Sequence, residues 1–135
     1  MFLRNCWYVA AWDHEVHRLQ LARRLLLGVA VVLYRNAGGR VVALEDRCCH
    51  RHAPLSMGRV RGSNVECKYH GLQFDPSGKC VHIPWQETIP PGACVRSYPV
   101  IEKCHWVWIW MGEPSLADES LIEDFHWMDH PDWRF

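Results

Sequence analysis

The sequence predicts an all-β protein built from short strands. Residues 29–34 and 40–44 are rich in β-branched and apolar side chains, and the Asn-Ala-Gly-Gly segment between them is typical of a hairpin turn. Residues 106–110 alternate tryptophan with valine or isoleucine, which indicates a strand with both faces covered. Only residues 12–21 and 120–128 are compatible with helices, and both segments are short.

The remaining predicted strands flank two segments that contain cysteine and histidine. The hairpin formed by residues 29–34 and 40–44 leads into the first of these segments. Residues 64–67 form a short strand that enters the second. Residues 95–101 and 105–111 are expected to make another hairpin, with residues 102–104 as its turn.

Length and charge describe one domain with an acidic end. The 135 residues are enough for a single core, and the formal net charge is zero. The charge is uneven, because residues 1–111 contain fourteen Lys or Arg against eight Asp or Glu, whereas residues 112–135 contain one against seven. We therefore predict a domain over residues 1–111 and an acidic tail over residues 112–135. The neutral total and the absence of a basic helix argue against nucleic-acid binding.

Two short motifs carry the chemistry. Cys48 and His50 form a C-x-H pair, and after sixteen residues Cys67 and His70 form a C-x-x-H pair. Two thiolates and two imidazoles are the ligand set of a Rieske centre, in which the thiolates bind one iron of a [2Fe-2S] cluster and the imidazoles bind the other. Neutral imidazole leaves the cluster less negative, so Rieske potentials run from about −150 to +300 mV against roughly −400 mV for plant-type clusters.

Three other interpretations of these residues remain. Cysteine and histidine also bind zinc, but common structural zinc patterns keep like ligands together, and here the order is interleaved. Cys48 or Cys67 near a histidine is compatible with a catalytic nucleophile in another fold. Buried cysteines beside surface histidines are the simplest alternative, although that leaves the repeated pairing unexplained.

The surrounding residues resemble the N-terminal Rieske domain of the Rieske non-haem iron oxygenases. The resemblance is strongest to the branch of the vanillate and dicamba O-demethylases, and it extends over essentially the whole chain. It departs from the common family pattern at Cys49 and Lys68, where proline is frequent, and at Leu72, where tryptophan is frequent. The matching segments are Asn5-Cys-Trp-Tyr-Val-Ala10, Cys48-Cys-His-Arg-His-Ala-Pro-Leu-Ser56, Cys67-Lys-Tyr-His-Gly71, Cys80-Val-His-Ile-Pro84, Val95-Arg-Ser-Tyr-Pro99 and Trp106-Val-Trp-Ile-Trp110.

The resemblance implies a fold of three small antiparallel sheets with two cluster-binding loops. It also implies one-electron transfer as the electron-entry domain of an oxidoreductase that hydroxylates aromatic rings or demethylates aromatic ethers. The donor would be an NAD(P)H-dependent flavin and iron–sulfur reductase or a ferredoxin. The resemblance also implies a homotrimer for the full-length form and mononuclear Fe(II) in a separate catalytic domain. We expect that domain to lie outside this chain and therefore expect no catalytic residues here.

A second hypothesis is a free-standing Rieske ferredoxin that shuttles electrons between a reductase and an oxygenase. Chain length alone favours it. A zinc-binding interaction module is a distant third. An in-frame continuation of the coding sequence beyond codon 135 would distinguish the oxygenase domain from the ferredoxin.

Several neighbours of the motifs are candidates for supporting roles. His52, His82 and Trp85 are candidates for tuning the potential or conducting charge, although a surface histidine is the commoner finding. Tyr69 lies between two ligands, and the resemblance implies that its hydroxyl donates a hydrogen bond to cluster sulfur; ordinary packing is the alternative. A basic rim that would steer an acidic electron donor is one interpretation of five neighbouring basic residues, and a merely solvated face is the other. These residues are Arg47, Arg51, Arg59, Arg61 and Lys68.

The tail contains three residues of the types that bind mononuclear iron. Glu123, His126 and His130 include the ligand types of a mononuclear iron centre. Their spacing does not match the catalytic motif of the family, and we interpret them as surface residues.

The other features predict a cytoplasmic protein with reduced thiols. No secretion signal opens the sequence, and the apolar run at residues 25–33 is too short to span a bilayer, so no membrane contact is expected. Without export, the five remaining cysteines are expected to be reduced and mostly buried. They are Cys6, Cys49, Cys80, Cys94 and Cys104.

Overall fold

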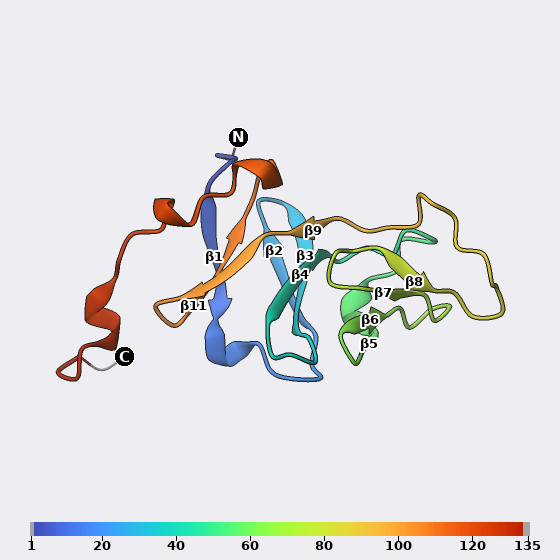
Figure 1. The fold of residues 1–135 in the computed structure, drawn as a ribbon, viewed down its shortest axis with the longest axis horizontal. Helices are drawn as coiled ribbons and strands as arrows, with labels where there is room; N and C mark the ends of the chain where they lie inside the picture. The colour runs from blue at the N-terminus through green and yellow to red at the C-terminus, as the bar shows by residue number, and fades with distance from the viewer. Residues whose placement is uncertain (1, 134–135) are drawn as a thin grey trace.

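The computed structural model describes residues 2–133, which form three small antiparallel sheets in an elongated arrangement (Figure 1). The first sheet has the order β1 (Trp7–Trp12), β11 (Trp106–Trp110) and β10 (Val100–Lys103). The second has the order β2 (Ala22–Leu26), β3 (Val29–Arg35), β4 (Val41–Glu45) and β9 (Ser97–Tyr98). The third has the order β5 (Arg59–Arg61), β6 (Asn64–Glu66), β7 (Gln73–Phe74) and β8 (Cys80–His82). The all-β prediction is confirmed.

Neither of the two segments that were compatible with helices forms an α-helix. Residues 12–21 form only the 3-10 turn η1 (Asp13–Glu15), after which the chain runs toward β2. Residues 120–128 are covered by two further 3-10 turns, η4 (Glu119–Leu121) and η5 (His126–Asp129). The other 3-10 turns are η2 (Leu55–Met57) and η3 (Pro114–Leu116). Each segment is held by contacts with the sheets rather than by its own helical periodicity.

Strand β3 contributes to two hydrophobic cores at once. Val32 and Tyr34 belong to the core shared with the third sheet, whereas Val31 and Leu33 belong to the core shared with the first sheet. All four side chains are fully buried. Successive side chains of a strand point to opposite faces, so a strand buried on both faces reads as the continuous apolar run seen at residues 29–34.

The tail covers the outer face of the first sheet. Val107 and Ile109 of β11 are buried in the core, whereas the ring of Trp108 faces the other way and stacks on Phe125, with centroids 6.0 Å apart. Ile122 is also buried, and its carbonyl accepts a hydrogen bond from Lys103 Nζ (3.0 Å). Both faces of β11 are therefore covered, as its alternating sequence predicted.

The hairpin between β10 and β11 turns later than expected. Its two turn residues, Cys104 and His105, have φ values of 54° and 62°. Positive φ at both central residues is the geometry of a type I′ turn, whose twist matches that of the flanking strands. Neither residue is the glycine or asparagine that usually signals such a turn, so the sequence placed it at residues 102–104.

Candidate iron–sulfur site

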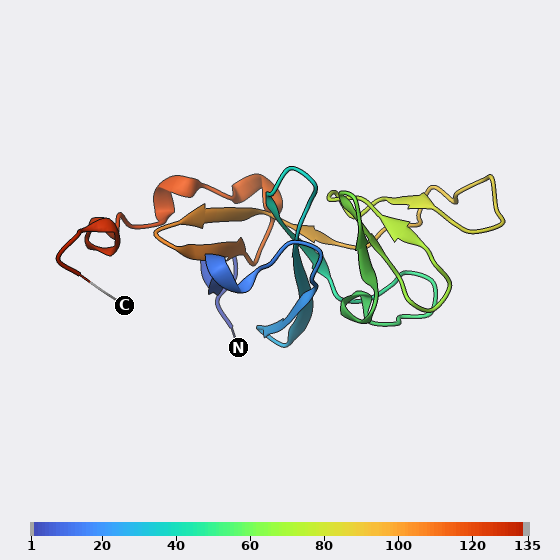
Figure 2. The ribbon, with the colours of Figure 1, turned by 90° about the horizontal axis from the view of Figure 1, so that it is seen from below.

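The two Cys/His motifs lie on neighbouring loops at the end of the molecule formed by the third sheet. The first loop connects β4 to β5, and the second connects β6 to β7 (Figures 1 and 2). Because β5 and β6 pair as a tight antiparallel hairpin, with Arg59 opposite Glu66, the loops that flank the hairpin emerge side by side.

The backbones of the two loops follow the same hydrogen-bonding pattern. In the first loop, Cys48 N–H donates to the carbonyl of Ala53 (2.9 Å). In the second, Cys67 N–H donates to the carbonyl of Leu72 (2.8 Å). Each cysteine therefore begins a closed turn of the same size, with its histidine inside the turn.

The residue just before the end of each turn has a left-handed backbone. The carbonyl of Cys48 accepts from His52 N–H (2.9 Å), and that of Cys67 accepts from Gly71 N–H (3.0 Å). His52 has φ 58° and Gly71 has φ 75°. Glycine adopts this region without steric cost, whereas a histidine there is strained.

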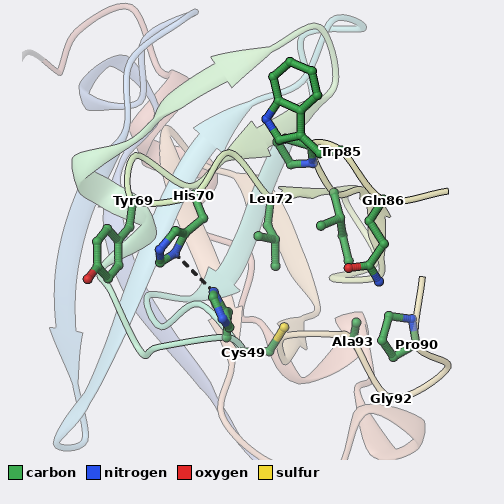
Figure 3. A pocket seen from close by; sticks show the side chains of 12 residues that line it. Cys49, Tyr69, His70, Leu72, Trp85, Gln86, Pro90, Gly92 and Ala93 are labelled. Carbon is green, nitrogen blue, oxygen red and sulfur yellow. Dashed lines mark hydrogen bonds between the residues drawn. The ribbon is translucent and has the colours of Figure 1, made fainter. Parts of the chain in front are cut away.

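The four motif side chains separate by burial. Cys48 and Cys67 are 1% and 2% exposed, whereas both histidines are exposed. The imidazoles of His50 and His70 meet across the two loops, with Nδ1 atoms 3.1 Å apart. Figure 3 shows this contact as a dashed line at His70, with the ring of Tyr69 beside it at a centroid distance of 3.9 Å. The structure thus brings together the four residues that the sequence singled out.

The buried thiols lie close enough to influence each other. Burial raises the pKa of the Cys48 thiol to about 12, and the neighbouring Cys67 thiol acts in the same direction, against a backbone hydrogen bond at His50 that lowers the pKa. Such a thiol keeps its proton at neutral pH unless a metal replaces it. The pair of thiols therefore suits a metal-bound thiolate, and the converging imidazole nitrogens offer two neutral donors beside it.

Comparisons with known proteins agree with this geometry. Residues 6–99 match the family described as the Rieske [2Fe-2S] domain. The chain belongs to this family. It is 59% identical over 134 residues to the iron–sulfur subunit of the toluene-4-sulfonate monooxygenase system of Comamonas testosteroni, covering 99% of this chain and 39% of that protein.

Relatives with O-demethylase activity match as well. The oxygenase component of dicamba O-demethylase from Stenotrophomonas maltophilia is 45% identical over 134 residues, covering 98% of this chain and 39% of that protein. The crystal structure of apo dicamba monooxygenase superimposes with a TM-score of 0.91 at 44% identity, covering 96% of this chain and 40% of that one. The chain spans about two fifths of the length of these relatives. The resemblance and the Rieske fold expected from the sequence are confirmed.

The residues of this Rieske domain fit the cluster that its family contains. A Rieske cluster requires two thiolates and two imidazoles from two loops, and the paired loops present that donor set in one place. An apolar cleft of about 880 Å³ opens beside the imidazoles. The cleft is lined by Cys49, Tyr69, Leu72, Ile83, Pro84 and Trp85, among others. Trp85 is fully exposed at its edge (Figure 3).

The other candidates near the motifs lie in different settings. His52 Nδ1 contacts Arg47 Nη2 at 3.1 Å, and His82 is an exposed residue of β8. Tyr69 is exposed and stacks on His70, so its predicted hydrogen bond to cluster sulfur stays a prediction.

The predicted basic rim is only partly available to a partner. Arg59 and Arg61 both pair with Glu66, at 2.6 and 3.2 Å, so one carboxylate offsets one of their two positive charges. Arg51 and Lys68 are exposed on the two loops, and no ion pair joins either to another of the described residues.

Sequence reasoning missed Asp46, which is 4% exposed and lies two positions before Cys48. A lone aspartate in a loop carries no periodic signal, so its role could not be predicted. Gly58 is predictable from the sequence as a glycine where the first loop bends. Its close approach to β6, where an added Cβ would be 1.9 Å from the carbonyl oxygen of Glu66, depends on a long-range contact and could not be predicted.

The remaining sequence candidates do not join the site. All seven cysteines are free, and of the five outside the motifs only Cys80 is fully buried, while Cys94 is exposed, so the expectation of mostly buried thiols was wrong. In the tail, His126 packs on Trp127, and His130 lies 3.8 Å from Asp132.

Within residues 2–133, no group of three or more His, Cys, Asp or Glu is placed to hold a single metal ion, whereas a Rieske cluster takes two protein ligands on each iron. None of the helical segments in that range is long and apolar enough to cross a membrane.

Proposed function

We propose that this domain transfers single electrons through a Rieske [2Fe-2S] cluster held by Cys48, His50, Cys67 and His70. The observation that supports this ligand set best is the meeting of the two histidine Nδ1 atoms, 3.1 Å apart, between loops of matching backbone pattern. When bound, the cluster accepts and releases one electron at a potential set by its two neutral ligands.

In this proposal the buried cysteines and the exposed histidines have different roles. Cys48 and Cys67, which are buried, would hold one iron as thiolates, with their negative charge shielded from water. His50 and His70, which are exposed, would hold the other iron and provide the route by which an electron reaches a partner. Outer residues such as Tyr69, packed on His70, restrict the orientation of the imidazole.

We further propose that the domain is the electron-entry part of an aromatic ring-hydroxylating or O-demethylating oxygenase. The identities with an iron–sulfur subunit of a toluene-4-sulfonate monooxygenase system and with an oxygenase component of dicamba O-demethylase support this assignment. In this proposal, residues 1–111 form the Rieske unit and residues 112–135 connect it to a catalytic domain with mononuclear Fe(II). The partners are an NAD(P)H-dependent reductase or a ferredoxin, and the setting is a cytoplasmic homotrimer.

The ligand set is tested by His70→Ala. We expect the wild-type chain, purified without air and supplied with iron and sulfide, to be red-brown, to contain two irons, and to give a Rieske electron paramagnetic resonance (EPR) signal after reduction. His70→Ala should lose the signal, whereas the matched variant His82→Ala, which removes another exposed histidine, should keep it. Two irons per chain in His70→Ala would refute the assignment. A colourless wild-type protein that binds zinc would favour the zinc module.

His50→Cys tests which iron ligands set the potential. A third thiolate adds negative charge to the cluster, so the reduction potential should fall toward the range of all-cysteine clusters, roughly −400 mV. Protein-film voltammetry of the variant and the wild type measures the shift. An unchanged potential in a variant that keeps its cluster would count against His50 as a ligand.

A further inference from the structure

Asp46 is the one charged side chain that is buried among residues 2–133. It lies between the end of β4 and the first motif, two residues before Cys48. Burying a carboxylate is costly unless hydrogen bonds and charge compensate it, so its partners indicate what the position requires.

The Asp46 carboxylate binds both the far end of the first loop and the second sheet. Ser56 donates twice, from its backbone N–H to Oδ1 (2.6 Å) and from its hydroxyl to Oδ2 (2.7 Å). Arg23 of β2 donates from Nε to Oδ2 (3.2 Å). The backbone N–H of Asp46 donates to the carbonyl of Ala30 in β3 (2.9 Å).

These bonds close the first loop at its base. Asp46 and Ser56 are the residues on either side of the nine that include Cys48 and His50, so one side chain joins the two ends of the loop. The second loop has no comparable need, because the β6–β7 ladder flanks it directly, with Glu66 opposite Gln73. The first loop instead ends in the short 3-10 turn η2, and within residues 2–133 the side chain of Asp46 alone ties this turn back to the start of the loop.

We propose that Asp46 is a positioning residue for the cluster: its carboxylate holds the loop in the conformation in which Cys48 and His50 present their ligand atoms together. The inference rests on the proposed ligand set. Because that loop supplies one ligand to each iron, releasing its base disturbs both irons at once.

The test compares amide variants of two adjacent carboxylates in the cluster-loaded chain. Asp46→Asn keeps the shape but replaces one acceptor oxygen with a donor, so it cannot accept from Ser56 and Arg23 as the carboxylate does. Glu45→Gln is the matched control, because it removes the same charge one residue earlier, and none of the side-chain hydrogen bonds described joins Glu45 to the loop. Ser56→Ala removes one of the two Ser56 bonds and leaves the carboxylate in place.

The readouts are the EPR g-values of the reduced protein and the rate at which a ferrous-iron chelator removes the cluster. We expect Asp46→Asn to shift or broaden the g-values and to lose the cluster about 10–100-fold faster, the range seen when outer-shell partners of metal sites are removed. Ser56→Ala should change both in the same direction by less, and Glu45→Gln should match the wild type.

The outcomes separate this inference from the proposed function. Wild-type g-values and release rate in a less stable Asp46→Asn would make Asp46 a structural residue only and overturn the inference. If Asp46→Asn fails to fold, a Ser56→Ala variant identical to the wild type in both readouts would overturn it too. Equal changes in Glu45→Gln would assign the effect to charge rather than position. A wild-type chain without a Rieske signal would instead sink the proposed function.

Discussion

His52 occupies a backbone position that glycine fills in the second loop. Its φ of 58° places the backbone of a residue with a bulky side chain in the left-handed region. Its imidazole contacts Arg47 at the surface. The same position in the second loop is Gly71, so the fold needs the conformation and not the imidazole. Strain of this kind persists only where the surrounding bonds determine the backbone.

Replacing this histidine with glycine should stabilise the domain. His52→Gly removes the left-handed strain, worth about 1 kcal/mol, and this gain exceeds the loss of an exposed contact with Arg47. His52→Ala is the control, because it loses the same contact and keeps the strain. Chemical denaturation of the apo chain measures both variants. A glycine variant no more stable than the alanine variant would show that the position is unstrained.

The hairpin of β5 and β6 sets the spacing of the two loops through a single close approach. Gly58 begins this hairpin, and the carbonyl oxygen of Glu66, the residue before Cys67, occupies the place of its missing side chain. A residue with a Cβ atom at position 58 would push β5 and β6 apart. It would therefore also change the distance between the two Cys/His loops.

Gly58→Ala should therefore destabilise the domain and weaken cluster retention. The added methyl group overlaps backbone, which cannot move aside cheaply, and the cost of such overpacking is about 1–3 kcal/mol. Gly92→Ala is the matched control, because an added Cβ there meets nothing within 4 Å and its φ is not positive. The unfolding midpoint and the iron content after purification report the difference. Equal stability of the two variants would contradict the close approach.

The tail is held to the first sheet by a few buried side chains. Ile122 is buried beside Lys103, while its neighbour Leu121 is mostly exposed. We expect Ile122→Ala to cost about 2 kcal/mol and Leu121→Ala close to none. Hydrogen exchange of the Met128 amide, which donates to the carbonyl of Phe125, would report release of the tail. Equal protection in the two variants would mean that Ile122 does not hold the tail.

Elements with strong local patterns could be predicted from the sequence, and elements fixed by distant contacts could not. The apolar run at β3 and the alternation of tryptophan with valine or isoleucine at β11 each predicted a strand, and both are strands. Strand β2 has the sequence ARRLL, without a clear period, and exists because it pairs along β3 from Ala22 to Leu26. The four motif residues could be predicted because their chemistry is specific, whereas Asp46 depends on its long-range partners.

At the scale of the whole molecule, the two motif loops and the acidic tail lie at opposite ends (Figure 1). The tail segment has one basic residue against seven acidic ones, whereas the loops add exposed Arg51 and Lys68. This separation of charge would favour an approach of the loop end toward an anionic surface.

Arg51 and Lys68 should therefore govern encounter with an acidic electron donor. In Arg51→Gln with Lys68→Gln, the rate of electron uptake should fall severalfold at low ionic strength and depend less on salt, because long-range attraction is weakened. Arg51→Lys with Lys68→Arg is the control, because it exchanges the two side chains and keeps both positive charges. Stopped-flow reduction at several salt concentrations measures the effect. A double variant with the wild-type salt dependence would exclude steering by these residues.

The unequal burial of the motif side chains gives the proposed cluster a buried cysteine side and a solvent-exposed histidine side. Sulfur ligands on the interior side are insulated by the core, and imidazoles on the other side touch solvent. The rate of electron tunnelling falls steeply with distance. Electrons would therefore both enter and leave the proposed cluster on the imidazole side. The electron donor and the catalytic domain of the proposed oxygenase would then both need access to this imidazole side.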